Sequence, residues 1–258
     1  GDTFLISGSG CVYSGGASDY DAVTTIDLSS QSLTTDFIFL NEFVNLESID
    51  LEFNSSVTIF DISQNTEITV VDIRGTGVEV LNVSNLLKLD IVSAFNANIN
   101  TFNLGTTSLN ISSIVIGSNN LTSIDATKLP KIKVLNYNSN NVSSITLTLC
   151  TLLEEHFAVG NNIASINYSN NPLLNYVNLF SNSLTDLDIS NNPLINFLQV
   201  HTNQLDNLVN SQLLIDLDAH GLSSGYFRSS IFGGGALTTA GATAKANLQG
   251  KGWTIVGI

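Results

Sequence analysis

The sequence predicts a solenoid of stacked repeats, built mainly from short β-strands. One observation is a pattern of apolar residues and one Asn that returns about every 21 residues over most of the chain. Another is that apolar and polar residues alternate within each repeat, which is typical of half-buried strands. Composition agrees, because 43% hydrophobic residues are enough for a core while only 12% are charged. Asn, Ser and Thr therefore supply most of the polar surface.

Residues 1–22 precede the first repeat and are rich in Gly and Ser. We expect them to form a leading coil or a linker. Cys11 lies in this segment and Cys150 lies within a repeat, and two cysteines do not make a disulfide framework. The chain begins at Gly1 and contains no Met. We therefore expect a processed product, a trimmed chain or a fragment of a longer, multidomain protein.

The repeats occupy residues 23–222. The clearest one begins at Leu174, continues with Val177 and Leu179, and reaches Asn182 at its ninth position. The first position of the pattern falls at equivalent apolar residues along the chain: Val23, Leu46, Ile68, Leu89, Ile111, Ile132, Leu153 and Ile195. A degraded last copy is expected to start at Leu214, which gives about ten coils.

The second half of each coil repeats as well. Residues 184–193 read LTDLDISNNP, and residues 163–172 echo them as IASINYSNNP. This pattern resembles the leucine-rich repeat family, in particular the short bacterial type with about 21 residues per repeat and an LDISNNP-like second half. The resemblance covers residues 23 to about 222. It implies parallel strands stacked along one face, and it is nearly silent on function.

A polar residue recurs at the point where each strand turns into a loop. We expect these side chains to point inward, where their amides can hydrogen-bond backbone groups of neighbouring coils. The members are Asn54, Asn119, Asn140, Asn161, Asn182 and Asn203. Thr76 and Ala97 replace the Asn in two coils.

Residues 223–258 are predicted to form a C-terminal cap, because an uncapped solenoid would expose its core. Three consecutive glycines, Gly233–Gly235, end the repeat. Thr238 then opens a predicted helix that stops at Gly250, and residues 253–256 read as a final strand. The small face of this helix is expected to hold Ala240, Ala244 and Leu248. The ending also resembles tails of bacterial and phage surface proteins.

Charge excludes two classes of partner. The net charge of −14 disfavours binding to nucleic acid and to anionic membranes. No apolar run reaches the roughly 18 residues that a membrane helix needs, so we expect no membrane insertion.

An enzyme is not expected either, because no nucleophile, metalloprotease, P-loop or dinucleotide motif occurs. Glu154 and Glu155 are the only candidates for glycan processing, and they lack an arguable paired-carboxylate geometry. His156 takes an inward position, so we expect a neutral, hydrogen-bonded core histidine there.

Two metal sites are weighed against simpler interpretations. His201 and His220 both hold the seventh position of their predicted coils, near Asp218, and could bind a transition metal. The alternative is two exposed polar residues in one column.

Asp27, Asp50 and Asp72 hold the fifth position of the first three coils and could bind Ca²⁺. The alternative is a solvated ladder of carboxylates, with Arg74 offsetting the charge. No other cofactor is expected.

Outward positions of the strands form one continuous surface. Its early members are small or acidic, whereas the later ones are large. Exposed aromatic residues on adjacent coils are typical of a recognition surface. The predicted ligand-binding face is Phe157, Tyr176, Phe180, Phe197, Gln199 and His201. The alternative is that a flanking domain, an oligomer partner or the cap covers these rings.

These features together favour a ligand-binding or adhesion module that recognises a protein or a carbohydrate on a cell surface. Its expected location is extracellular, on a cell surface or on a virion. The alternative is a structural module of a larger fibre, such as a phage tail or a bacterial surface appendage.

Overall fold

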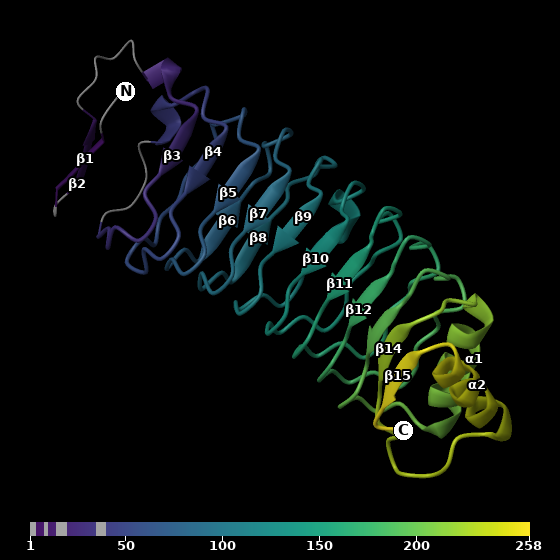
Figure 1. Cartoon of the computed structure of the whole chain (residues 1–258). Coiled ribbons are helices and arrows are strands. Elements are labelled where there is room, and N and C mark those ends of the chain that lie inside the picture. Colours follow the sequence, from purple (N-terminus) through teal and green to yellow (C-terminus); the bar gives the residue numbers. More distant parts are fainter. Residues whose placement is uncertain (1–3, 8–9, 14–19, 35–39) are drawn as a thin grey trace. The chain divides into compact units, whose positions relative to one another are not determined.

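The structure is a computed structural model that describes residues 4–7, 10–13, 20–34 and 40–258. It divides into two compact units, Gly1–Leu121 (unit 1) and Thr122–Ile258 (unit 2). Figure 1 shows the element order along the chain, and each unit is described by itself. The predicted boundaries at residues 22 and 222 do not coincide with the division between the two units, and they stay predictions.

Unit 1 carries a row of three-residue parallel strands joined in register. Each strand buries its central residue and turns the two flanking residues outward. Their order is β3 (Thr25–Asp27), β4 (Ser48–Asp50), β5 (Val70–Asp72), β7 (Ile91–Ser93) and β9 (Ser113–Val115). Buried Leu, Ile and Val side chains from successive coils fill the space behind the strands.

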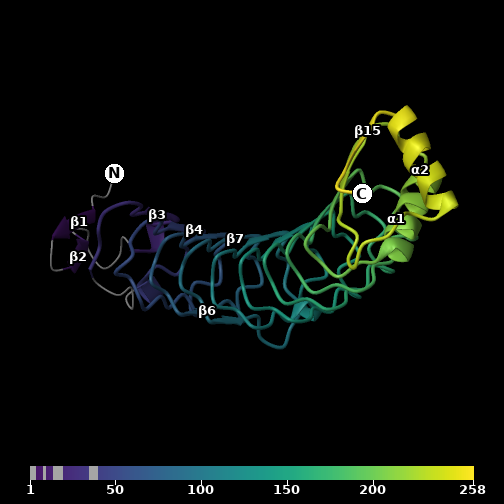
Figure 2. The ribbon, with the colours of Figure 1, turned by 90° about the horizontal axis from the view of Figure 1, so that it is seen from below.

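The opposite side of each coil in unit 1 is mostly turns. The strands that pair there are β6 (Val80–Asn82) and β8 (Thr101–Asn103), and Phe60 makes an isolated bridge. Figure 2 shows β6 across the coil from β4 and β7. The remaining elements of unit 1 are short: β1 (Phe4–Ser7), which pairs antiparallel with β2 (Gly10–Tyr13), and the 3₁₀ turns Tyr20–Ala22 and Leu40–Glu42.

Unit 2 continues the same pattern. Its parallel strands are β10 (Val134–Asn136), β11 (Glu155–Phe157), β12 (Tyr176–Asn178), β13 (Phe197–Gln199), β14 (Gly225–Arg228) and β15 (Trp253–Val256). A 3₁₀ turn, Ala126–Lys128, precedes them. Leu174, Val177 and Leu179 are fully buried. The predicted parallel solenoid is therefore confirmed.

The inward Asn residues form the predicted amide ladder. Asn161 is typical: its Nδ2 donates to the carbonyl oxygens of Tyr137 (3.1 Å) and Ala158 (3.2 Å). Its Oδ1 accepts from the backbone N–H of Val142 at 3.0 Å. Asn182 and the equivalent residues bind neighbouring backbone groups in the same way. The side chains thus satisfy backbone groups that the turn would otherwise leave unpaired.

A second row of buried Asn side chains was not predicted. It lies in the turns of the second half of the coils, where Asn192 Nδ2 donates to the carbonyls of Tyr168 (3.0 Å) and Asn171 (2.8 Å). Asn65 and Asn171 make equivalent bonds. The Asn before each Pro in SNNP is therefore structural.

The predicted last repeat from Leu214 is wrong, because residues 207–220 form the helix α1 (Asn207–His220). Asp206 caps its first turn by accepting from two backbone N–H groups, and Gly221 ends it in the left-handed conformation. Leu213, Leu214 and Leu217 are buried, at the spacing that places residues on one helix face. The apolar face of α1 therefore packs against the buried interior in place of a last repeat.

The rest of the cap follows the prediction closely. Thr238 caps α2 (Thr239–Gly250), and β15 follows it. Ala240, predicted on the packed face, is exposed. Gly241 packs there instead, because a Cβ on it would lie 2.6 Å from the Cβ of Ser211 in α1. Figure 2 shows the two helices side by side in unit 2.

Candidate binding surface on the strand face

Four aromatic rings stack along the outward face of the strands β11 to β14. We call them the aromatic ladder: Phe157, Tyr176, Phe197 and Tyr226. The ring centroids of Phe157 and Tyr176 lie 4.8 Å apart, those of Tyr176 and Phe197 3.9 Å, and those of Phe197 and Tyr226 5.1 Å. Tyr176 and Phe197 are nearly parallel, at 6°.

Strand register produces this stack. Tyr176, Phe197 and Tyr226 are direct partners on β12, β13 and β14, so the strand spacing brings their rings into contact. All four rings are half-buried, and no described residue covers them fully. The structure therefore brings together Phe157, Tyr176 and Phe197 as predicted.

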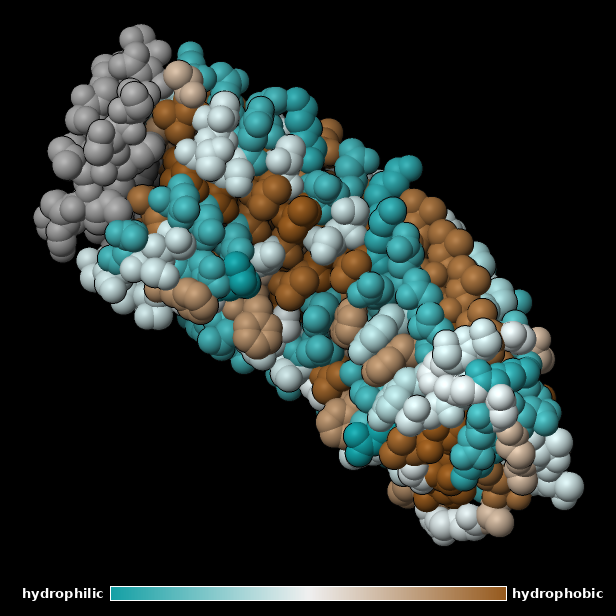
Figure 3. Space-filling view, viewed as in Figure 1, coloured by the Kyte–Doolittle hydropathy of each residue, from teal (hydrophilic) through white to brown (hydrophobic). Residues whose placement is uncertain are grey.

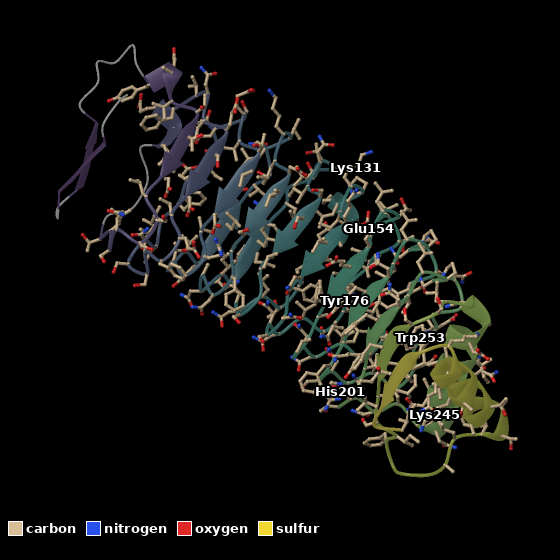
Figure 4. The ribbon with its side chains drawn as sticks, viewed as in Figure 1. Lys131, Glu154, Tyr176, His201, Lys245 and Trp253 are labelled. Carbon is tan, nitrogen blue, oxygen red and sulfur yellow. The ribbon has the colours of Figure 1, made fainter. Side chains whose placement is uncertain are left out.

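A second stack lies beyond the carboxyl ends of β12 and β13. The rings of Phe180 and His201 are 4.1 Å apart and inclined by 16°. Gln199 pairs in register with Arg228, and Arg228 is exposed. Burial, followed by the charge of Arg228, lowers the pKa of His201. Figure 4 shows where Tyr176 and His201 lie on the ribbon.

Sequence reasoning missed Tyr226, the fourth ring of the ladder. It follows Phe197 by 29 residues because α1 enlarges the connection between β13 and β14, and so it falls outside the 21-residue register. Residues 225–228 read GYFR, which does not alternate clearly, and the structure shows that only Phe227 of this strand is fully buried.

The charged surroundings of the ladder differ at its two ends. Glu155 is the register partner of Tyr176 on β11. Burial, and then the negative charge of Glu155, raise the pKa of the Tyr176 hydroxyl. Arg228 lies beside His201 and Gln199 at the other end of the strands. Figure 3 shows apolar side chains interspersed with polar ones on the face in view.

His156 is a neutral core histidine, as predicted. It is fully buried, its Nδ1 lies 2.6 Å from the hydroxyl of Tyr168, and its Nε2 lies 3.0 Å from the hydroxyl of Tyr137. Burial lowers the pKa of the imidazole to about 3. Cys150 is buried too, and its thiol pKa is raised by burial to about 11, so neither group is poised as a nucleophile or base.

The predicted carboxylate ladder in unit 1 is in register. Asp27, Asp50 and Asp72 are direct partners on β3, β4 and β5. Among the described residues, the one group of three potential metal ligands that gathers within 4.8 Å is Asp50, Glu52 and Asp72. Sequence reasoning missed Glu52, and Asp27 lies outside the group.

Arg74 already binds two of these carboxylates. Its guanidinium contacts Asp72 at 2.7 Å and Glu52 at 3.0 Å, and its pKa is raised first by the hydrogen bond to Asp72. These contacts support the alternative in which Arg74 offsets the negative charge of the carboxylates. Calcium binding by Asp27, Asp50 and Asp72 stays a prediction.

The histidine pair does not share a column. His201 follows β13, whereas His220 is the last residue of α1, so the register that would have paired them is absent. Asp218 is engaged by Lys251 at 2.5 Å and by Asn247 at 2.8 Å. The expectation that both hold the seventh position of a coil is wrong, because a helix replaces the last coil, and a transition metal at His201 and His220 stays a prediction.

Comparison with known proteins gives the fold. No family model matches the chain, and no curated protein matches it. It is similar to the functional domain of InlJ from Listeria monocytogenes, at 17% identity and a TM-score of 0.60 over 86% of this chain and 52% of that one. This chain thus spans about half the length of the InlJ structure.

Two further solved structures are similar. The leucine-rich repeat domain of APL1B matches at 19% identity and a TM-score of 0.62, over 83% of this chain and 64% of that one. The Leptospira interrogans leucine-rich repeat protein LIC12759 matches at 15% identity and a TM-score of 0.55, over 90% and 71%. No helix among the described residues has both the length and the apolar character to cross a membrane. The chain has the leucine-rich repeat fold, with a small helix and strand cap at its C-terminal end.

Proposed function

We propose that this chain is an extracellular binding or adhesion module that recognises its partner through the strand face of unit 2. The observation that carries the proposal is the aromatic ladder. Stacked rings on a rigid row of strands present a large apolar area that loses little conformational freedom on binding. Half-buried aromatic side chains of this kind are typical centres of binding energy.

The stacking favours a protein over a glycan as the partner. Tyr176 lies between Phe157 and Phe197, and Phe197 lies between Tyr176 and Tyr226, so both faces of each inner ring are already covered. Sugars bind aromatic residues mainly through exposed ring faces, whereas apolar protein side chains can pack against ring edges. Glu155 and Arg228 add opposite charges near the surface that can orient a polypeptide.

The structural relatives support this proposal only at the level of the fold. InlJ and a second Listeria protein, internalin C2, share it at 17% and 20% identity. Leucine-rich repeat domains generally bind proteins, which agrees with a binding module. The short repeat type, with its LDISNNP-like half, adds a bacterial or phage surface origin to the proposal.

The experiment is a binding screen of the whole chain against two arrays, one of purified extracellular protein domains and one of glycans. Each hit is retested with a Tyr176→Ser/Phe197→Ser double variant. We expect protein hits, and we expect the double variant to weaken them by at least tenfold, equal to about 1.4 kcal/mol or more. The fold should persist, because neither side chain is part of the buried core.

Phe232→Ser is the matched control. Phe232 is 57% exposed, belongs to the same unit and lies outside the strands. Its loss should leave binding unchanged. Hits that survive the double variant, or hits lost equally in the control, would contradict recognition by the ladder.

The alternative, a structural module of a larger fibre, predicts that copies of the chain cover the ladder. Sedimentation at increasing protein concentration distinguishes the two. A binding module keeps the mass of one chain, whereas a fibre module gains mass with concentration and loses that gain in the Tyr176→Ser/Phe197→Ser variant.

A further inference from the structure

Unit 1 exposes two phenylalanine side chains beyond the carboxyl ends of its strands. Phe53 follows β4 and is 63% exposed, the highest value for a large hydrophobic side chain in the part of the chain that the structure describes. Phe95 follows β7 and is 47% exposed. Neither ring contributes to the buried interior, so packing within the unit does not account for them.

The two phenylalanines are linked through the coil between them. The backbone N–H of Phe53 donates to the carbonyl of Arg74 at 2.8 Å, and the N–H of Gly75 donates to the carbonyl of Phe95 at 3.0 Å. Two strand spacings separate their coils, which is about 10 Å. The ring of Phe53 lies over Gly75, since a Cβ on Gly75 would be 2.9 Å from its Cδ1. The two residues therefore lie at the same ends of their strands, about two strand spacings apart, on either side of the coil that carries Arg74 and Gly75.

The backbone conformation at position 53 is unfavourable for a large side chain such as Phe. Its φ is +61°, a left-handed conformation that suits Gly or Asn and is uncommon for a bulky residue. The equivalent residues of the other coils in unit 1 are small or polar: Ser30, Gly75, Asn96 and Ser118. An aromatic side chain at this position is unfavourable for folding, which indicates a use outside folding.

Acidic side chains lie on the coil of Phe53 and on the coil between the two phenylalanines. The carboxylates of Asp50, Glu52 and Asp72 gather within 4.8 Å, and the single guanidinium of Arg74 leaves the group with a net charge of −2. Unit 1 as a whole has 14 acidic and 2 basic residues, a net charge of −12, whereas unit 2 has 8 acidic and 6 basic, a net charge of −2. The negative potential is therefore concentrated on the unit that exposes Phe53 and Phe95.

We propose that Phe53, Phe95 and the carboxylates of Asp50, Glu52 and Asp72 form a docking surface for a cationic polypeptide segment that carries apolar side chains. Lysine or arginine side chains would complement the unbalanced carboxylates, and apolar side chains between them would cover the two rings. Polyanions are excluded by charge. Figure 3 shows apolar and polar side chains interleaved over unit 1.

A panel of labelled synthetic peptides tests this proposal by fluorescence anisotropy with the whole chain. One peptide alternates Leu and Lys, and its two controls alternate Ser and Lys, and Leu and Glu. We expect the Leu/Lys peptide to bind at least tenfold more tightly than either control. Added salt should weaken it, because the charged partners are screened.

Variants locate the binding site. Phe53→Ser/Phe95→Ser should weaken the Leu/Lys peptide at least tenfold. Thermal stability should be equal or higher, because Ser occupies the position of Phe53 in two other coils and Phe95 is exposed. Phe232→Ser in unit 2, which removes an equally exposed ring, should bind like the parent. Asp50→Asn/Glu52→Gln should weaken binding and reduce its salt dependence.

Several results would overturn the proposal. They are no binding of the Leu/Lys peptide, equal binding of the Ser/Lys peptide, or unchanged binding by the Phe53→Ser/Phe95→Ser variant. Loss of binding in the Tyr176→Ser/Phe197→Ser variant would move the site to unit 2. A parent chain that self-associates through Phe53, shown by sedimentation, would identify a second copy as the occupant. These readouts are independent of the partner proposed for the aromatic ladder.

Discussion

Replacing Asn161 with Ala measures what one buried amide contributes to the solenoid. The substitution removes the bonds from Nδ2 to three carbonyls and the bond from the Val142 N–H to Oδ1. The carbonyls of Tyr137 and Ala158 keep an amide donor from Asn140 and Asn182, and the carbonyl of Val159 keeps a backbone N–H donor. The N–H of Val142, a fully buried residue, loses its side-chain acceptor. One buried, unsatisfied N–H costs about 1–3 kcal/mol, and this is the expected loss of unfolding free energy.

Urea unfolding followed by circular dichroism checks this value. Asn162→Ala is the matched control, because Asn162 is the adjacent residue and is exposed. Its change should stay within about 0.5 kcal/mol. If the two variants had the same unfolding midpoint, the amide ladder would not stabilise the stack and the reasoning would be refuted.

Three other perturbations have defined outcomes. The pKa of His156 is about 3 in the folded chain against an ordinary 6.5, so the unfolded chain binds the proton first. The free energy of unfolding, measured with urea, should therefore fall by up to about 2 kcal/mol as the pH drops from 6.5 to 5, and this fall should vanish in His156→Leu. Arg74→Gln leaves its three carboxylate neighbours without a cation. Calcium should therefore raise the melting temperature of this variant more than that of the parent chain. Equal shifts in the two chains would contradict the role of Arg74 as the cation that offsets these carboxylates. Gly241→Ala should destabilise the cap by about 1–3 kcal/mol through a clash with α1, whereas Gly250→Ala, with nothing within 4 Å, should be nearly neutral in thermal melts.

Most of the fold could be predicted from the sequence because one local pattern serves every coil. The alternation around Leu174, Val177 and Leu179 specifies a strand, and repetition in register specifies its partners. The inward Asn followed from its place at the end of each strand. Periodicity is thus a strong predictor wherever neighbouring coils are equivalent.

The prediction of the fold failed near the C-terminal end, where the chain no longer repeats the pattern of the preceding coils. Asp206 and Gly221 are helix start and stop signals, and they outweigh the apolar residues that had been assigned to a last repeat. That helix also displaces Tyr226 from the 21-residue register, so the fourth ring of the ladder was missed. The expectation that His201 and His220 hold the same repeat position failed for the same reason.

Side-chain geometry accounts for the remaining differences. A position in the repeat shows that Tyr176 and Phe197 face outward, but it does not show that they stack at 3.9 Å with their faces covered. That detail is the basis on which we propose a protein partner and not a glycan. Likewise, the position of Phe53 does not show a left-handed backbone or 63% exposure.

Oxidative footprinting of the aromatic side chains tests the central claim most directly. The whole chain is exposed to hydroxyl radicals with and without a protein hit from the array, and modification is read by mass spectrometry. The account predicts protection of Tyr176, Phe197 and Tyr226 on binding, with Phe232 unchanged. Unaltered modification of the three ladder rings in a saturated complex would contradict recognition by the strand face of unit 2.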